Sequence, residues 1–309
     1  MSPPARRSAL DRPSLGIVLS LPAEARDNLR MSGWLRLEGG AWAPAGAPAP
    51  GEVAAAESWL VDDGRARGLD RHWARFARGC AEAGLAVASP RAAVEGALPA
   101  TGRWFPRVEA RTGGEVRLAV RPPPPRAPGV VAWIANGPDP RRAPRRKGPD
   151  LERLGALRTA AARHGAGEAL IADADGRLLE GAFTSLLWWE DDALCAVPDD
   201  APILDGVTRA LLLGLAADAG AEVRFRRPAP AGLDGREVWL TSALHGIRAV
   251  TGWVADGARG VPGRAGTAER AAAWQARLEA LAVPVGAAAV SAPDARSAGR
   301  GAPSARPAG

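Results

Sequence analysis

The sequence predicts a mixed α and β fold, of the α+β class, arranged in two lobes. The first half carries segments that alternate at strand period around one helix. The second half alternates helices and strands more regularly, and two proline-rich segments, 122–128 and 137–148, lie between the halves. With 309 residues, the chain is long enough for two domains that each bury a core of their own.

The expected elements of the first half are short. Strands are expected where apolar and polar side chains alternate, at 34–38, 58–62 and 115–120. One helix is expected at about 69–86, between the second and third of these strands. The apolar segment Val130–Ala135 is typical of a further short strand, which we place at the end of this half.

The second half begins with a helix and a hairpin. The helix is expected to run from its N-cap, Asp150, to about Gly165, because leucines recur on one face between them. The segments 168–172 and 177–180 flank an Asp-Ala-Asp-Gly turn, which is a hairpin signal.

A second helix and two strands complete this half. Asp205 is expected to cap a helix that runs through Leu215, and Gly220 ends it. Strands are expected at 222–226 and 237–241, where apolar residues again alternate with charged or polar ones.

These elements predict a domain order with its boundary at about residue 136. The expected order is an extension at 1–32, a small N-terminal domain at 33–135, an interdomain crossing at 136–146, a large C-terminal domain at 147–285 and a tail at 286–309. The extension is expected to be disordered or mis-started, because Met31 is the only other methionine and domain sequence begins just after it. The tail is rich in Pro, Ser and Arg and lacks aromatic residues, as is typical of disorder.

Composition excludes several classes of protein. With 47% hydrophobic and 24% charged residues the chain is expected to be globular, and no apolar run is long enough to span a bilayer. The net charge of +6 rests on dispersed arginines, which argues against a nucleic-acid partner. Two cysteines and three histidines form no disulfide framework and no zinc motif, so we expect no metal site and a cytoplasmic location.

Lys147 is the only lysine; the rest of the 40 basic Lys and Arg residues are arginines. Where bare positive charge suffices, this chain uses Arg, so a surviving Lys indicates chemistry that Arg cannot perform. A buried primary amine can attack a carbonyl and hold it as a Schiff base, whereas a guanidinium stays protonated. The alternative is a surface charge that ends the basic run 141–146.

A lysine that holds pyridoxal phosphate needs an acid beside the pyridine nitrogen and donors for the phosphate. Glu180 follows a hairpin strand, from which a carboxylate can project into a cleft. Gly206-Val207-Thr208 stands at a helix start, where free N–H groups bind phosphate, and Arg75 on the first-half helix supplies a cation. Each of these features alone is typical of an ordinary structural role.

The order and spacing of these motifs resemble the class IV aminotransferases, the fold type IV pyridoxal-phosphate enzymes. This family includes branched-chain and D-amino-acid aminotransferases and 4-amino-4-deoxychorismate lyases. The resemblance runs from about Trp34 to Val285. The segments that carry it are His72-Trp-Ala-Arg-Phe76, Lys147, Gly165-Ala-Gly-Glu-Ala-Leu-Ile171, Gly176, Glu180-Gly181, Gly206-Val-Thr-Arg209 and Leu240-Thr-Ser-Ala-Leu-His-Gly-Ile-Arg-Ala-Val250.

The resemblance implies a role for each site residue. Lys147 would form the Schiff base with pyridoxal 5′-phosphate, and Glu180 would pair with the pyridine nitrogen. Arg75 would bind the phosphate together with Val207 and Thr208, and a loop would add contacts from Ser242 and Ala243. The family also implies a homodimer in which the cofactor lies between a small N-terminal and a larger C-terminal domain.

The chain departs from the family pattern where the substrate is bound. In the segment 53–59 only Glu57 survives from the usual motif, and the chain contains no tyrosine, which argues against a typical branched-chain enzyme. The Ser242-Ala243-Leu244 segment is closer to the form seen in aminodeoxychorismate lyases.

We therefore expect an enzyme that transfers an amino group between an amino acid and a 2-oxo acid. The alternatives are 4-amino-4-deoxychorismate lyase and, more remotely, a non-catalytic member of the fold. Arg107 and Arg248 are candidates for binding the substrate carboxylate, with a surface role as the alternative for each.

Overall fold

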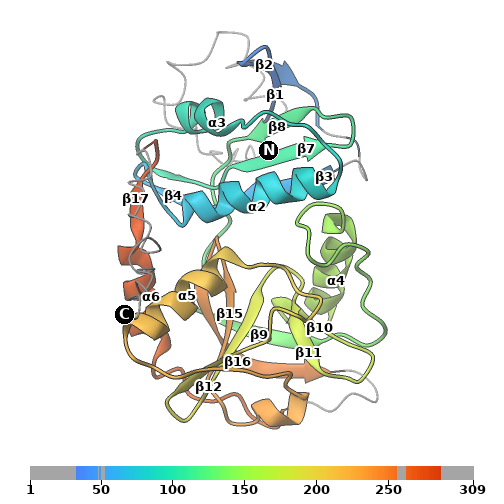
Figure 1. The fold of residues 1–309 in the computed structure, drawn as a ribbon. Coiled ribbons are helices and arrows are strands. Elements are labelled where there is room, and N and C mark those ends of the chain that lie inside the picture. Colours follow the sequence, from blue (N-terminus) through green and yellow to red (C-terminus); the bar gives the residue numbers. More distant parts are fainter. Residues whose placement is uncertain (1–32, 48, 50–52, 256–261, 287–309) are drawn as a thin grey trace, which may run out of the picture.

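The computed structural model describes residues 33–47, 49, 53–255 and 262–286. Figure 1 shows two lobes stacked one above the other, with α2 (Leu69–Glu82) along the face of the upper lobe that is turned toward the lower one. Apart from Gly286, the segments predicted to be an extension and a tail lie outside the described residues. No helix in the described ranges is long and apolar enough to cross a membrane.

The upper lobe is built on a five-stranded antiparallel sheet. Its strand order is β2 (Ala41–Ala45), β1 (Trp34–Glu38), β8 (Val116–Ala119), β7 (Arg107–Arg111) and β3 (Val53–Ser58). The helix α2 and the short α3 (Arg91–Ala97) pack on this sheet and bury aromatic side chains that include Trp59, Trp73 and Phe76. The edge strand β3 thereby lies directly against α2, and the site described below begins at this contact.

A second, four-stranded sheet completes the upper lobe. Its order is β17 (Ala282–Pro284), β5 (Arg65–Arg67), β4 (Val61–Asp62) and β6 (Arg103–Trp104). Because β17 pairs with β5, the last described part of the chain returns from the lower lobe to the upper one.

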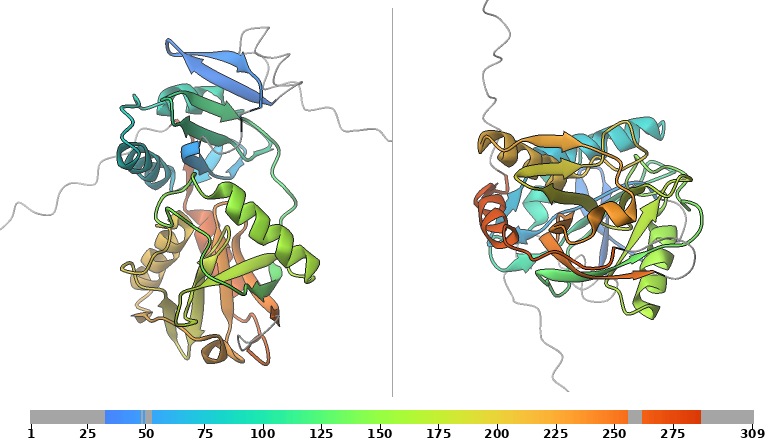
Figure 2. Two further views of the ribbon diagram at one scale, coloured as in Figure 1. Left: turned by 90° about the vertical axis from the view of Figure 1, so that its right-hand side faces the viewer. Right: turned by 90° about the horizontal axis from the view of Figure 1, so that it is seen from below.

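The lower lobe is built on an eight-stranded mixed sheet. Its order is β11 (Leu178–Gly181), β10 (Glu168–Ala172), β9 (Gly129–Ile134), β16 (Gly246–Ala255), β15 (Val238–Ser242), β12 (Ser185–Glu190), β13 (Ala193–Ala196) and β14 (Val223–Phe225). One face carries a large apolar core. The other face is covered by α4 (Leu151–Arg163) at β9 and β10, and by α5 (Val207–Asp218) and α6 (Ala271–Ala280) at β12 and β15. These helices lie on two flanks of the lobe (Figure 2).

The strand β9 differs from the sequence-based expectation. We predict it as the last strand of the N-terminal domain, yet it pairs with β10 and β16 in the lower lobe. The reason is packing, because Val130, Ala132 and Ile134 fill the core of the lower sheet. The proline-rich segment 122–128 therefore makes a crossing between the lobes, ahead of the predicted boundary.

Two further expectations need correction. The predicted strand 58–62 is divided between β3 and β4, which belong to different sheets, because the chain turns at Trp59 and Leu60 to bury both side chains. The predicted capping side chains are also wrong: neither Asp150 nor Asp205 caps its helix through its carboxylate. Asp150 instead accepts hydrogen bonds from the N–H groups of residues 142 and 143, and Asp205 pairs with Arg78.

The other predicted elements agree with the structure to within a few residues. The hairpin of β10 and β11 is confirmed, as are the strands at 34–38 and 115–120 and the three predicted helices. The strands β12 and β13 carry apolar runs without alternation, and the long strand β16 mixes apolar residues with Arg, Thr and Gly, so none of the three gave a strand prediction.

Candidate active site

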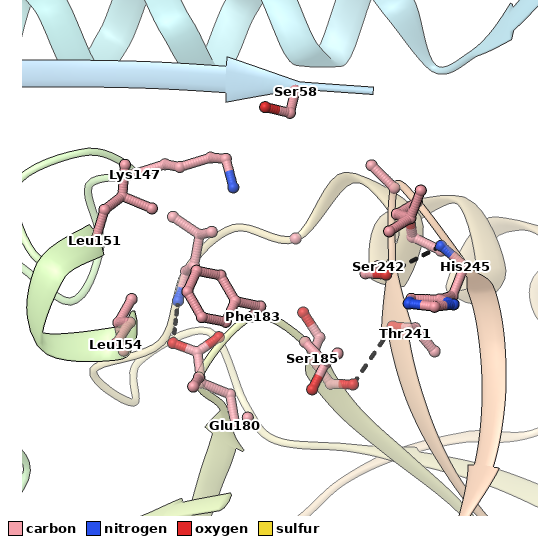
Figure 3. A pocket seen from close by; sticks show the side chains of 18 of the residues that line it. Ser58, Lys147, Leu151, Leu154, Glu180, Phe183, Ser185, Thr241, Ser242 and His245 are labelled. Carbon is pink, nitrogen blue, oxygen red and sulfur yellow. Dashed lines mark hydrogen bonds between the residues drawn. The ribbon is translucent and has the colours of Figure 1, made fainter. Parts of the chain in front are cut away.

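A cavity of about 590 Å³ lies between the lobes. The upper lobe contributes β3, α2 and the segment around β7, and the lower lobe contributes α4, the strands β11 and β15, and the start of α5. In Figure 3, Lys147 projects into this cavity, with Glu180 on one wall and Ser242 and His245 on another. All seven residues predicted for the cofactor site line this one cavity: Arg75, Lys147, Glu180, Val207, Thr208, Ser242 and Ala243.

Lys147 is fixed through its backbone to the strand β3. Its carbonyl accepts a hydrogen bond of 2.8 Å from the N–H of Ala56. The next residue, Gly148, has a φ of 139°, and a Cβ there would lie 3.0 Å from the Cα of Ala55. Only glycine both adopts this conformation and allows so close an approach. The two lobes are therefore joined at the residue that carries the lysine side chain.

The amine of Lys147 is poised to lose its proton near neutral pH. Burial lowers its pKa from 10.5 to about 8, against the opposing attraction of Glu57. The guanidinium groups of Arg75, Arg107 and Arg121 contribute to this lowering, because like charges repel. A neutral amine is the form that attacks a carbonyl.

A buried ion-pair network holds Arg75 at the cavity wall. The Glu57 carboxylate accepts hydrogen bonds from Nε and Nη2 of Arg75, at 2.6 and 2.9 Å, and lies 2.7 Å from Nδ1 of His72. Burial alone would raise the pKa of Glu57, but Arg75 and His72 together lower it to about 2. Sequence reasoning noted Glu57 and His72 within motifs yet gave neither a role.

The start of α5 faces the same wall. Nη1 of Arg75 donates a hydrogen bond of 2.6 Å to the carbonyl of Asp205, directly before the helix. The first N–H groups of α5, on Val207 and Thr208, have no earlier carbonyl within the helix to bind, so they favour an anion. Gly206 completes the cradle, because a Cβ there would lie 2.3 Å from Oγ of Ser185.

Glu180 lines the same cavity and has a positive partner. Its carboxylate accepts hydrogen bonds from the N–H of Leu204, at 2.9 Å, and from Nη1 of Arg141. Burial raises the pKa of Glu180 to about 7 in spite of this guanidinium. Sequence reasoning missed Arg141, which stands in a run of arginines, and nothing local distinguishes it from its neighbours.

The turn after β15 forms another part of the cavity wall. Oγ of Ser242 accepts a hydrogen bond of 3.2 Å from the N–H of His245, and the carbonyl of Ala243 accepts one of 3.1 Å from Arg67. These contacts fix the turn against the upper lobe. Ser242 and Ala243 lie on the cavity wall, and their contact with the cofactor stays a prediction.

Residues 54–253 match the family "Amino-transferase class IV", which covers more than half of the chain. The chain belongs to the class IV aminotransferase family. This membership confirms the family predicted from the motifs and the prediction of an enzyme. No curated protein sequence matches the chain.

Solved structures of aminotransferases share the fold of this class IV enzyme. A hypothetical aminotransferase from Mycobacterium tuberculosis, in its apo form, is 23% identical, with a TM-score of 0.66 over 82% of this chain and 98% of that one. A branched-chain aminotransferase from Thermoproteus uzoniensis, solved with norvaline, is 16% identical, with a TM-score of 0.66 over 75% and 90% of the two chains. A putative branched-chain aminotransferase from Thermotoga maritima is 18% identical, with a TM-score of 0.66 over 81% and 96%. The predicted fold type is confirmed.

The class IV site contains groups that fit a phosphorylated pyridine aldehyde. Arg75 has five N–H groups, and three of them donate hydrogen bonds to Glu57 and Asp205. The other two are available to a ligand and adjoin the free amides of α5. The cavity also offers a carboxyl group with a pKa near neutrality, Glu180, and the amine of Lys147 projects into it. Within the described ranges, no group of three or more His, Cys, Asp or Glu residues could hold a metal ion.

Proposed function

We propose that this chain transfers an amino group between an amino acid and a 2-oxo acid, with Lys147 as the residue that holds the cofactor covalently. The observation that carries the proposal is the place of the only lysine. It projects into the cavity between the lobes, and burial lowers the pKa of its amine to about 8. A non-catalytic protein of this fold would have no use for a buried amine with a lowered pKa.

Pyridoxal 5′-phosphate is the cofactor, as predicted, and membership of the class IV family confirms it. A structure of the Mycobacterium tuberculosis aminotransferase is described as a form with this cofactor bound. Bound pyridoxal phosphate supplies the electron sink that accepts the pair left when the substrate loses its α-proton.

In this proposal, the phosphate lies at the start of α5. The amides of Val207 and Thr208 and the free N–H groups of Arg75 bind it, because a helix N-terminus and a guanidinium both favour a dianion. Glu57 orients Arg75 for this contact through two hydrogen bonds. The turn of Ser242 and Ala243 adds contacts from the wall that it forms.

Glu180 in this proposal lies beside the ring nitrogen. Its raised pKa, about 7, means that the carboxyl group and a pyridine nitrogen can share a proton at neutral pH. Arg141 keeps the carboxyl group in place from the other side. Lys147, once released from the cofactor, moves the proton to and from the substrate, since an amine with a pKa near 8 exchanges it readily.

A second candidate is 4-amino-4-deoxychorismate lyase, favoured by the Ser242-Ala243-Leu244 turn on the cavity wall. Both activities use the same lysine as acid and base. For either one we also propose a cytoplasmic homodimer that acts on a small amino-carboxylate, with no nucleic-acid or membrane partner.

The test begins with the purified protein and its cofactor. We expect the purified protein to be yellow. Borohydride should abolish its visible band by reducing the imine, which leaves the cofactor attached to Lys147. The Lys147→Ala protein should be colourless. Lys147→Arg should also be inactive, because it keeps the charge and loses the nucleophile. A colourless wild-type protein that takes up no cofactor would contradict the proposal. Conversion of the cofactor to its amine form by an amino donor alone supports transamination, whereas pyruvate release from aminodeoxychorismate without an acceptor supports the lyase.

A further inference from the structure

Two arginines outside the cavity hold one part of its wall in place. Arg67 belongs to β5 in the upper lobe, and Arg126 belongs to the proline-rich segment 122–128 that crosses between the lobes. Neither is among the described residues that line the cavity, whereas Arg107 and Arg248, the candidates for the substrate carboxylate, both line it. Any effect of Arg67 and Arg126 on a ligand in the cavity must therefore pass through the residues that they contact.

Both guanidinium groups bind the turn between β15 and β16, residues 242–245, which we call the cofactor turn. Nη2 of Arg67 donates a hydrogen bond of 3.1 Å to the carbonyl of Ala243. Nη2 of Arg126 donates one of 3.2 Å to the carbonyl of His245. The two carbonyl groups belong to residues only two positions apart, so an upper-lobe strand and the interlobe segment hold the same short stretch of backbone.

The helix α6 supports the same turn. Oε1 of Gln275 accepts a hydrogen bond of 2.8 Å from the N–H of Ile247, and its Nε2 donates one of 2.7 Å to Glu279, which lies 3.1 Å from Nη2 of Arg126. Gly246 has a φ of 70°, and a Cβ there would lie 2.3 Å from Oε1 of Gln275, so only glycine allows this approach. The chain then runs from α6 into β17 along one flank of the molecule and pairs with β5 (Figure 1). The turn is thus held by three segments that are distant in the sequence.

Stability alone does not account for Arg67. Its side chain is buried, and its Nη1 has no hydrogen-bond partner among the described residues. Burial and the guanidinium of Arg126 lower the pKa of Arg67 to about 10; the attraction of Glu279 offsets part of this lowering, but that carboxylate pairs with Arg126. Burying a charge without its own counter-charge destabilises a fold. The contact with the cofactor turn is therefore what this arginine contributes.

We propose that Arg67 and Arg126 are positioning residues for the cofactor phosphate, which they influence by holding the turn that carries Ser242 and Ala243. Hydrogen bonds to main-chain carbonyl groups restrict the backbone of the turn and leave its N–H groups and the Ser242 hydroxyl for a ligand. Because Arg67 belongs to the upper lobe and the turn to the lower one, the affinity for the phosphate then depends on the contact between the lobes. This inference rests on the proposed function.

The test compares pyridoxal phosphate with pyridoxal, which has the same aldehyde and lacks the phosphate. Both are titrated into the cofactor-free, full-length protein, and the visible band that forms on Lys147 gives each dissociation constant. We call the ratio of the constant for pyridoxal to that for pyridoxal phosphate the phosphate preference. Arg67→Gln and Arg126→Gln should each lower this preference by about five- to tenfold, because each removes one hydrogen bond that holds the turn. The affinity for pyridoxal should stay unchanged.

The matched control is Arg65→Gln. Arg65 lies on the same strand, β5, and also donates a hydrogen bond to a carbonyl, but to that of Ala282 in β17 and not to the cofactor turn. This variant should keep the phosphate preference of the wild type. Arg67→Lys keeps a charged donor and should retain part of the preference. Arg126 is partly exposed, so Arg126→Gln is expected to fold and decides the test if Arg67→Gln does not.

Three outcomes overturn the positioning role: an unchanged phosphate preference in the Arg67→Gln and Arg126→Gln proteins, an equal fall in the Arg65→Gln protein, or equal weakening of both ligands. Equal weakening would show that these arginines act only through the general stability of the fold. The same titrations test the proposed function separately. A wild type that attaches neither aldehyde contradicts that function, whereas attachment of both with an unchanged preference in the variants overturns the positioning role alone.

Discussion

The carboxylate of Glu57 forms two hydrogen bonds with the guanidinium of Arg75, at 2.6 and 2.9 Å, and both groups are buried. The contact joins the edge strand β3 to the helix α2. It also fixes the cation that faces the start of α5, so that an interaction wholly within the upper lobe positions a guanidinium against the lower one.

Glu57→Gln is expected to destabilise the protein and weaken cofactor binding. Because it leaves Arg75 buried without its counter-charge, the free energy of unfolding should fall by about 3 kcal/mol. The pKa of Glu57 is about 2 in the folded protein and 4.5 without the fold, so its stabilising effect is present above pH 4.5 and is lost as the pH falls toward 2. Urea unfolding at several pH values measures this difference.

A matched control for that variant is Glu109→Gln, on the neighbouring strand β7. Glu109 is also buried and also pairs with arginines, Arg107 and Arg111. Its substitution should cost comparable stability but leave the affinity for pyridoxal phosphate unchanged. Equal loss of cofactor affinity in both variants would show that Glu57 acts only through general stability.

Gly148→Ala should separate the lysine segment from β3. A Cβ at this position would lie 3.0 to 3.1 Å from backbone atoms of Ala55 and Ala56, and the φ of 139° is unfavourable for alanine. We expect a loss of about 1 to 3 kcal/mol of stability and weaker cofactor attachment. Gly214→Ala, at an exposed helical position with open space, is the control and should stabilise by about 0.5 to 1 kcal/mol. Equal stability of the two variants would contradict this account of Gly148.

Local sequence patterns predicted the parts of the site that lie on regular elements. Arg75 stands on an amphipathic helix, and Val207 and Thr208 stand at a helix start, both of which have signals in the sequence. Glu180 lies at the end of a hairpin with a clear turn motif. The role that we propose for Lys147 came from composition and from resemblance, and its burial follows only from the fold.

What the sequence did not predict depends on contacts between distant segments. Arg141 pairs with Glu180 across 39 positions, and Arg158 and Arg248 line the same cavity from a helix and a strand 90 residues apart. Membership of β9 in the lower sheet is also a long-range property, because its apolar run would fit the core of either lobe. Periodicity describes one element at a time and cannot determine such pairings.

Glu180→Gln should change how stability depends on pH in the cofactor-free protein. Burial raises the pKa of Glu180 from 4.5 to about 7, so the folded state binds the proton more tightly than the unfolded state. The free energy of unfolding of the wild type should therefore fall as the pH rises from 4.5 to 7, by up to about 3 kcal/mol. The variant should lack this decrease, as thermal unfolding at pH 5 and pH 8 would show. An identical pH dependence in both proteins would contradict the assigned shift.

Arg141→Gln provides the complementary measurement. Arg141 lowers the pKa of Glu180 against the effect of burial, so its removal should raise that pKa further and move the pH-dependent decrease in stability to higher pH.

With the cofactor bound, Glu180→Gln should retain most of the affinity for the cofactor yet slow the reaction, because an amide cannot share a proton with the ring nitrogen. An unchanged rate would remove the role that we propose for Glu180.

Gly206→Ala should disturb the phosphate cradle, and a second substitution should repair it. The added Cβ would lie 2.3 Å from Oγ of Ser185 but 3.4 Å from its Cβ, so only the hydroxyl clashes. We expect the single variant to lose about 1 kcal/mol or more of stability and to bind inorganic phosphate more weakly. The double variant with Ser185→Ala should recover most of both. Failure of the double variant to recover would mean that the helix start itself rejects a side chain.

The pH dependence of cofactor attachment should report the pKa of Lys147. Only the neutral amine attacks the aldehyde, so the rate at which the cofactor-free protein gains its visible band should rise with pH and level off above about 8. Arg107→Gln removes a nearby positive charge, so the pKa of Lys147 should increase and the midpoint should move to higher pH. Since burial is the largest cause of the lowered pKa, this shift should be smaller than the one that burial produces. Arg163→Gln, remote from the cavity, should leave the midpoint unchanged, and a midpoint near 10.5 in the wild type would show that the fold does not activate the lysine.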